Sequence, residues 1–179
     1  VIYGSPISII GNGVVVDPKA LLSEISYLKD KGIEPKLLVS DRCHIIMPYH
    51  IELDSALSGH QAELAAGSTG RGIAPVYADK MFRNGIRMID LLEPDILKQK
   101  LEKGYAFAKG IIEKSLNKKM ISEPDSIFQD YIDFGIKLKD YVSDTSVELY
   151  KAHKNGKSIL FEGAQGISLD VDHGIYPYT

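Results

Sequence analysis

SIIGNGVVVDP, at residues 8–18, is the part of the sequence that sets the fold class. Its two short β-branched runs flank Gly11-Asn12-Gly13, a pattern typical of strands around a tight turn. Asp17-Pro18 then predicts the start of a helix, because aspartate caps free N–H groups and proline suits the first turn. Helical spacing of Leu21, Ile25 and Leu28 carries this helix to a candidate C-cap at Gly32.

Strands are expected next at residues 36–40, at residues 44–47 before Pro48, and much later at residues 158–161. The initial order of strand, helix and strand favours an α/β fold with a mostly parallel central sheet flanked by helices. Without repeats or linkers, one domain or part of one is the simplest interpretation.

The other predicted elements are helices. Residues 50–66 are expected to be helical in part, and residues 75–83 to form a short helix. Two long helices begin at Pro94 and Pro124 with no strand between them, which predicts a helical hairpin inserted into the sheet or packed on it. The first apolar face carries Leu97, Leu101, Tyr105, Ala108 and Ile112, and the second carries Ile127, Tyr131, Leu138, Val142 and Leu149.

The composition is that of an ordinary globular protein. The 179 residues carry 21 basic and 24 acidic side chains, a balance that suggests neither a nucleic-acid nor a membrane partner. No apolar run is long enough to span a membrane. The single cysteine, Cys43, has no partner for an internal disulfide, which fits a cytoplasmic location, and we expect it to be a small buried residue.

A glycine-dense stretch, GSTGRG at residues 67–72, is the first candidate for chemistry. Its glycines allow sharp turns and close approach of a ligand to the backbone, while Ser68, Thr69 and Arg71 supply donors that suit a phosphate. It is not a Walker A loop, because no Gly-Lys-Ser/Thr follows. A flexible surface loop is the alternative interpretation.

A basic group, Lys80, Arg83 and Arg87, follows that loop and strengthens the phosphate interpretation, although a solvated charged face has the same pattern. EGAQG at residues 162–166 follows the predicted strand, where Gln165 could read a carbonyl or purine edge, or where the chain simply turns. DVDHG at residues 170–174 lacks the spacing of a standard metal motif, and we favour a structural role for its carboxylates, in capping or in salt bridges.

Three separated motifs, at residues 8–15, 67–75 and 161–174, combine in order and spacing with the basic group and with Tyr176-Pro177-Tyr178. Together they resemble the adenylosuccinate synthetase family. The resemblance implies a P-loop-NTPase-like fold. It also implies GTP-dependent ligation of L-aspartate to IMP through 6-phosphoryl-IMP, giving adenylosuccinate, GDP and phosphate in de novo AMP biosynthesis. The implied partners are IMP, GTP, L-aspartate and a second subunit, the implied cofactor is Mg²⁺, and the implied location is the cytoplasm.

The resemblance also implies residue roles. Thr69, with Ser68 beside it, is expected to bind the 5′-phosphate of IMP. Arg83 is expected to reach across a homodimer to the IMP phosphate of the other subunit. Gln165 is the catalytic candidate, expected to hold the 6-oxygen of IMP where charge develops. The further substrate-side candidates are Arg71, for the aspartate carboxylates, and Lys80 and Arg87, for a positive pocket.

The resemblance covers only the interior of the family, as part of a single domain at residues 1–179. The family's N-terminal phosphate loop, its aspartate base, its histidine acid and its C-terminal guanine-binding portion have no counterpart here, and no metal ligand is expected in this chain. Departures at Ser68, Ala74 and Thr179 replace a usual threonine, glycine and valine. Because catalysis needs its groups placed together, we expect the 179 residues alone not to turn over IMP.

Two other interpretations stay open at this point. The chain could be a non-catalytic nucleotide-binding module or an inactive fragment, or it could be an unrelated α/β phosphotransferase.

Overall fold

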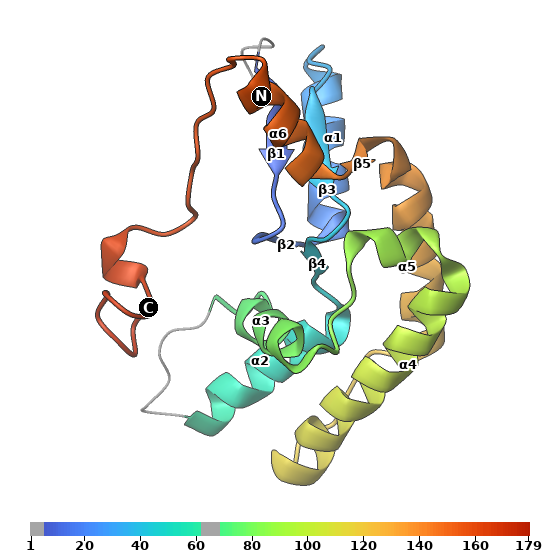
Figure 1. Ribbon diagram of the computed structural model, residues 1–179. Coiled ribbons are helices and arrows are strands. Elements are labelled where there is room, and N and C mark those ends of the chain that lie inside the picture. Colours follow the sequence, from blue (N-terminus) through green and yellow to red (C-terminus); the bar gives the residue numbers. More distant parts are fainter. Residues whose placement is uncertain (1–5, 62–68) are drawn as a thin grey trace.

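The computed structural model describes residues 6–61 and 69–179 (Figure 1). The strands are Ser8–Ile10 (β1), Val15–Val16 (β2), Leu37–Ser40 (β3), His44–Ile45 (β4) and Val142–Ser143 (β5). The helices are Pro18–Asp30 (α1), Pro48–Gln61 (α2), Ile73–Phe82 (α3), Pro94–Lys109 (α4), Pro124–Leu138 (α5) and Thr145–Lys154 (α6). A π-helical turn at Gly110–Ser115 extends α4, and 3₁₀ turns lie at Met88–Leu92, Lys139–Tyr141 and Ile167–Leu169.

The central sheet is parallel, as the sequence predicted. Its strand order is β1-β3-β5, with Ile9 opposite Leu38 and Val39 opposite Val142. The short strands β2 and β4 form a second parallel pair. All three strands of the central sheet therefore end at the same edge, which is where ligands of α/β sheets bind.

Helix α1 begins as its sequence predicts. The Asp17 carboxylate accepts hydrogen bonds from the N–H groups of Lys19 (2.9 Å) and Ala20 (3.2 Å), and Pro18 occupies the first turn. The helix ends before Gly32, which adopts a positive φ of 73°. Between these ends, α1 buries Leu21 and Ile25 in the same core as Val39 of β3.

Helices α4 and α5 supply much of that core. Every residue of the predicted apolar face of the first helix, from Leu97 to Ile112, is buried. The two helices pack against each other, and α5 also packs against α1. They follow one another without an intervening strand, while their origin as an insertion stays a prediction.

The second long helix is shorter than the sequence suggested. It ends at Leu138, whereas the predicted apolar face continued to Leu149. The Asp144 carboxylate caps a new helix by accepting from the N–H groups of Ser146 (3.1 Å) and Val147 (3.2 Å). This cap separates α5 from α6 and leaves Val142–Ser143 free to pair with β3 as β5.

The predicted strand at residues 158–161 is wrong. These residues lie outside any strand, and the Leu160 and Phe161 side chains are 92% and 80% exposed. A strand requires a neighbour that accepts its backbone hydrogen bonds, and Figure 1 shows the chain after α6 leading away from the sheet. Among the described helices, none has the length and apolar character that a membrane crossing requires.

Candidate functional site

Helix α3 carries the predicted phosphate-binding residues at its two ends. Thr69 and Arg71 are exposed just before it, and Arg83 is exposed just after it with a left-handed φ of 64°. A ten-residue helix is about 15 Å long, so Arg83 is separated from Thr69 and Arg71 by about the length of the helix. Ser68, predicted to act beside Thr69, lies outside the described residues.

The loop enters α3 through left-handed backbone at Gly70 (φ 67°) and Gly72 (φ 77°), as its glycine content predicted. Gly72 also lies against α2: a Cβ atom there would stand 2.9 Å from the backbone of His50 and Ile51. Its N–H donates to the buried carboxylate of Asp54, at 2.8 Å. Gly72, the residue that directly precedes α3, is thus held on α2.

The other end of α3 is also held by α2. The ring of His50 accepts at Nδ1 from the Met47 N–H (2.9 Å), so its proton lies on Nε2, which donates to Asp79 Oδ2 at 3.0 Å. Both side chains are buried. The Asp79 carbonyl in turn accepts from the N–H groups of Asn84 (2.9 Å) and Gly85 (3.2 Å), which fixes the turn that contains Arg83.

A third contact directs α3 towards the ends of the strands. The Tyr77 hydroxyl donates to the carbonyl of Gly13 at 2.7 Å, and Lys80 Nζ donates to the carbonyl of Asn12 at 3.3 Å. Both acceptors belong to the turn that follows β1. Lys80 therefore faces the carboxyl edge of the sheet. This position is compatible with the predicted positive pocket.

Asn12 joins the ends of all three central strands. Its side-chain oxygen accepts from Ser40 Oγ at 2.6 Å, at the end of β3. The same oxygen accepts from Thr145 Oγ1 at 3.4 Å, and its amide nitrogen donates to Ser146 Oγ at 3.3 Å, just after β5. The edge of the sheet next to α3 is therefore cross-linked by polar contacts.

Lys80 and Arg87 are brought to one place, beside the buried ring of His44. Burial, together with the positive charges of Lys80 and Arg87, lowers the pKa of His44 to about 4. His44 Nδ1 is buried and has no hydrogen bond to any described residue. The Arg87 N–H donates to Asp90 Oδ2 at 2.7 Å, and that carboxylate also binds Lys100 Nζ at 2.6 Å.

Gln165 is not brought to α3. It is exposed in the segment that follows α6, which Figure 1 shows apart from α3. Thr179 lies in the same exposed segment. Within it, the Asp170 carboxylate accepts from the N–H groups of Asp172 and His173, both at 2.9 Å, so of the two predicted structural roles Asp170 has the capping one.

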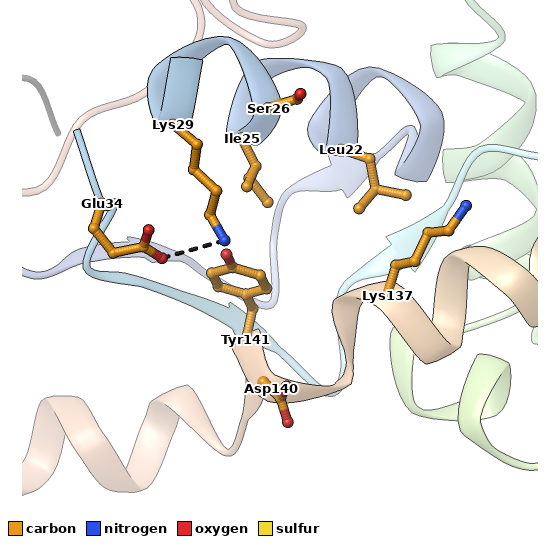
Figure 2. A pocket seen from close by; sticks show the side chains of 8 residues that line it. All are labelled: Leu22, Ile25, Ser26, Lys29, Glu34, Lys137, Asp140 and Tyr141. Carbon is orange, nitrogen blue, oxygen red and sulfur yellow. Dashed lines mark ion pairs between the residues drawn. The ribbon is translucent and has the colours of Figure 1, made fainter. Parts of the chain in front are cut away.

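A cavity of about 480 Å³ lies elsewhere, between α1 and the end of α5 (Figure 2). It is lined by Leu22, Ile25, Ser26, Lys29, Glu34, Lys137, Asp140 and Tyr141. Lys29 pairs there with Glu34 at 3.3 Å, and the Tyr141 hydroxyl and Glu34 raise its pKa. None of the predicted site residues lines this cavity, and its Lys29 charge is already matched, so we place the candidate site at α3.

Comparisons with known proteins decide the family. The model of the adenylosuccinate synthetase family matches residues 1–179. The chain belongs to the adenylosuccinate synthetase family. It is 48% identical over 182 residues to the adenylosuccinate synthetase of Clostridium acetobutylicum, and 45% identical over 180 residues to that of Streptococcus gordonii. Each alignment covers 100% of this chain and 42% of the relative, so the chain spans less than half the length of these relatives.

A solved structure supports the same family. The fully ligated adenylosuccinate synthetase from Plasmodium falciparum superposes with a TM-score of 0.84 at 30% identity. The match covers 98% of this chain and 41% of that one. The predicted fold class and family resemblance are thereby confirmed, whereas the roles of individual residues and the single-domain assignment stay predictions.

The residues that hold α3 do not stand out in the sequence. His50 and Asp54 looked like isolated polar residues in a partly helical segment, and their partners Asp79 and Gly72 lie 29 and 18 positions away. Only the packing of α2 against α3 brings them together. The available signal was that both sit one turn apart on α2, which places them on one helix face.

Proposed function

We propose that this chain forms the IMP-binding part of an adenylosuccinate synthetase, which joins L-aspartate to IMP with GTP in AMP biosynthesis in the cytoplasm. The observation that carries the proposal is the structure of α3. The helix presents Thr69 and Arg71 at the end of a left-handed glycine loop, and it is anchored on two sides. Family membership supplies the chemistry of the ligand.

The phosphate of IMP binds at the entry to α3 in this proposal. Thr69 donates its hydroxyl and Arg71 supplies positive charge, both from exposed positions. Lys80 and Arg87 add positive charge near the strand ends, which favours an anionic ligand at that edge. Gln165 has to move from its exposed position to hold the 6-oxygen, so its catalytic role requires a rearrangement of residues 155–179.

Arg83 serves the IMP of a second subunit in this proposal. Support comes from its position about 15 Å along α3 from the loop, which separates it from a phosphate at Thr69 of the same chain. Replacing Arg83 with Leu should weaken IMP binding at protein concentrations where dimers form and leave it unchanged in dilute monomers. Sedimentation with calorimetry measures both, and equal affinities at all concentrations would remove Arg83 from the site.

Mg²⁺ is the cofactor that the family implies for the whole reaction. Within residues 6–61 and 69–179, no three His, Cys, Asp or Glu side chains gather as ligands for a metal ion. In this proposal, residues outside the described part of this chain hold Mg²⁺. The contribution of this chain is to bind and orient IMP, the nucleotide that accepts the phosphoryl group.

A comparison of IMP and GTP binding tests the proposal. Calorimetry on the 179-residue chain should show tighter binding of IMP than of GTP, because the described phosphate loop is not a Walker A loop. The same sample should yield no adenylosuccinate from IMP, GTP and aspartate. Binding of GTP alone would favour an unrelated phosphotransferase, and measurable product would contradict the view that essential groups lie outside this chain.

A further inference from the structure

We propose that His50 and Asp54 of α2 are positioning residues for IMP, which set where α3 presents its phosphate-binding groups. The inference rests on the proposed function, because it concerns the same ligand. It adds two buried residues that act through α3 and that lie outside the motifs identified in the sequence.

The two residues act on opposite ends of α3. Asp54 accepts the Gly72 N–H at 2.8 Å, directly behind the loop with Thr69 and Arg71. One turn earlier on α2, His50 donates to Asp79 at 3.0 Å, in the last turn before Arg83. Both ends of α3 are therefore held by residues 50–54 of α2, and α3 can neither slide nor rotate without breaking a buried polar contact.

Burial raises the free-energy cost of breaking these contacts. His50 is 1% exposed, and Asp54 and Asp79 are 5% and 6% exposed. A buried carboxylate or imidazole that loses its partner cannot turn to water, so each contact favours one position of α3 strongly. The His50 ring is itself fixed, because its Nδ1 accepts from the Met47 N–H at the start of α2.

The Asp54 contact also affects where a phosphate can bind. A free helix N-terminus attracts anions, but here the protein's own carboxylate occupies the N–H of Gly72. A bound phosphate therefore cannot use the Gly72 N–H, and in this proposal it is held by Thr69 and Arg71 ahead of α3. Asp54 thus removes one possible phosphate donor in addition to fixing the helix.

Substitutions at Asp54 test this role against a matched control on the same helix. Asp54→Ala should raise the calorimetric Kd for IMP about tenfold or more and speed hydrogen exchange of the Gly72 amide. Asp54→Asn keeps an acceptor oxygen and should restore the affinity to within about threefold. Glu52→Ala is the control, because Glu52 accepts the N–H groups of Ile121 (2.7 Å) and Ser122 (2.9 Å), which lie outside α3.

His50 provides a second, independent comparison. Gln can place its amide nitrogen near the position of Nε2 and keep the donor to Asp79, while Asn can replace only the acceptor at Nδ1. His50→Asn should therefore weaken IMP binding more than His50→Gln does. Thermal unfolding of each variant separates this effect from a general loss of stability.

The outcomes distinguish failure of the proposed function from failure of the positioning role. If the unchanged chain does not bind IMP, the proposed function fails, while Gly72 exchange still reports whether Asp54 holds α3. If IMP binds but Asp54→Ala and Glu52→Ala change the Kd equally, or Asp54→Ala binds IMP more tightly, the positioning role is overturned. Equal affinities of the two His50 variants would overturn it at the other end of α3.

Discussion

Gly72 is the residue whose conformation the candidate site depends on most. It combines a φ of 77° with backbone contact to α2, so a side chain there is opposed both by its own backbone and by His50. Gly70 shares the positive φ of 67°, but the described structure leaves open space around it. Comparing Gly70 with Gly72 therefore separates the free-energy cost of a left-handed backbone from the cost of a side chain against α2.

Gly72→Ala should destabilise the chain more than Gly70→Ala. The backbone penalty common to both is roughly 1–2 kcal/mol, and the Gly72 variant must also displace α2. Urea denaturation gives the free energy of unfolding of each variant. Equal losses would show that the contact between Gly72 and α2 does not constrain the helices.

His44 makes stability depend on pH. Its pKa is about 4 in the folded chain and 6.5 in the reference state, with burial as the main cause. Below pH 6.5, His44 binds a proton in the unfolded chain but not in the folded chain. The free energy of unfolding therefore falls as the pH drops towards 4. The slope contributed by this one group is at most about 1.4 kcal/mol per pH unit.

Urea denaturation between pH 7 and pH 4.5 measures this effect. His44→Gln should lose less stability over that range than the unchanged chain does. The exposed His60 provides the matched control, because His60→Gln should leave the slope as it was. Parallel slopes for all three proteins would contradict the assignment to His44.

Asn12 links three strands, so its importance appears only when the elements are considered together. Ser40 is fully buried, and its hydroxyl donates to Asn12 at 2.6 Å. Asn12→Ala should therefore lower the free energy of unfolding by about 1–3 kcal/mol, because a buried donor loses its main acceptor. Asn12→Asp keeps the acceptor oxygen and should lose clearly less. If both substitutions cost the same, the amide contacts to α6 dominate instead.

The elements themselves were predictable where local chemistry determines them. Asp17-Pro18 starts α1, and the face from Leu97 to Ile112 is buried because helical spacing alone identifies it. The prediction failed at Val142 and Leu149, where apolar spacing continued past a new cap at Asp144. It also failed at residues 158–161, because strand formation depends on a neighbour that local sequence does not specify.

The residue types of the candidate site are visible in the sequence, whereas the contacts that support the site are not. Thr69, Arg71 and Arg83 stand out by type and spacing, and the structure places them at the two ends of one helix. The contacts that hold this helix, from His50 to Asp79 and from Asp54 to Gly72, join residues far apart in sequence. Such pairs depend on how α2 packs on α3, which periodicity does not reveal.

The molecule as a whole places its candidate ligand site at α3, beside the carboxyl edge of the parallel sheet. The turn after β1 receives Tyr77 and Lys80, and the ends of β3 and β5 meet at Asn12. Figure 1 shows the segment with Gln165 away from this region, so the phosphate contact proposed at Thr69 does not depend on the position of Gln165. Binding can therefore be tested without catalysis.

Calorimetric titration of IMP into the 179-residue chain and its Thr69→Ala and Thr69→Ser variants tests the central claim most directly. A hydrogen bond to a charged phosphate is worth about 1.5–3 kcal/mol, so Thr69→Ala should weaken IMP binding roughly 10- to 150-fold. Thr69→Ser keeps the hydroxyl and should bind within about threefold of the unchanged chain. Equal affinity of all three proteins for IMP would contradict the claim that the α3 loop binds its phosphate.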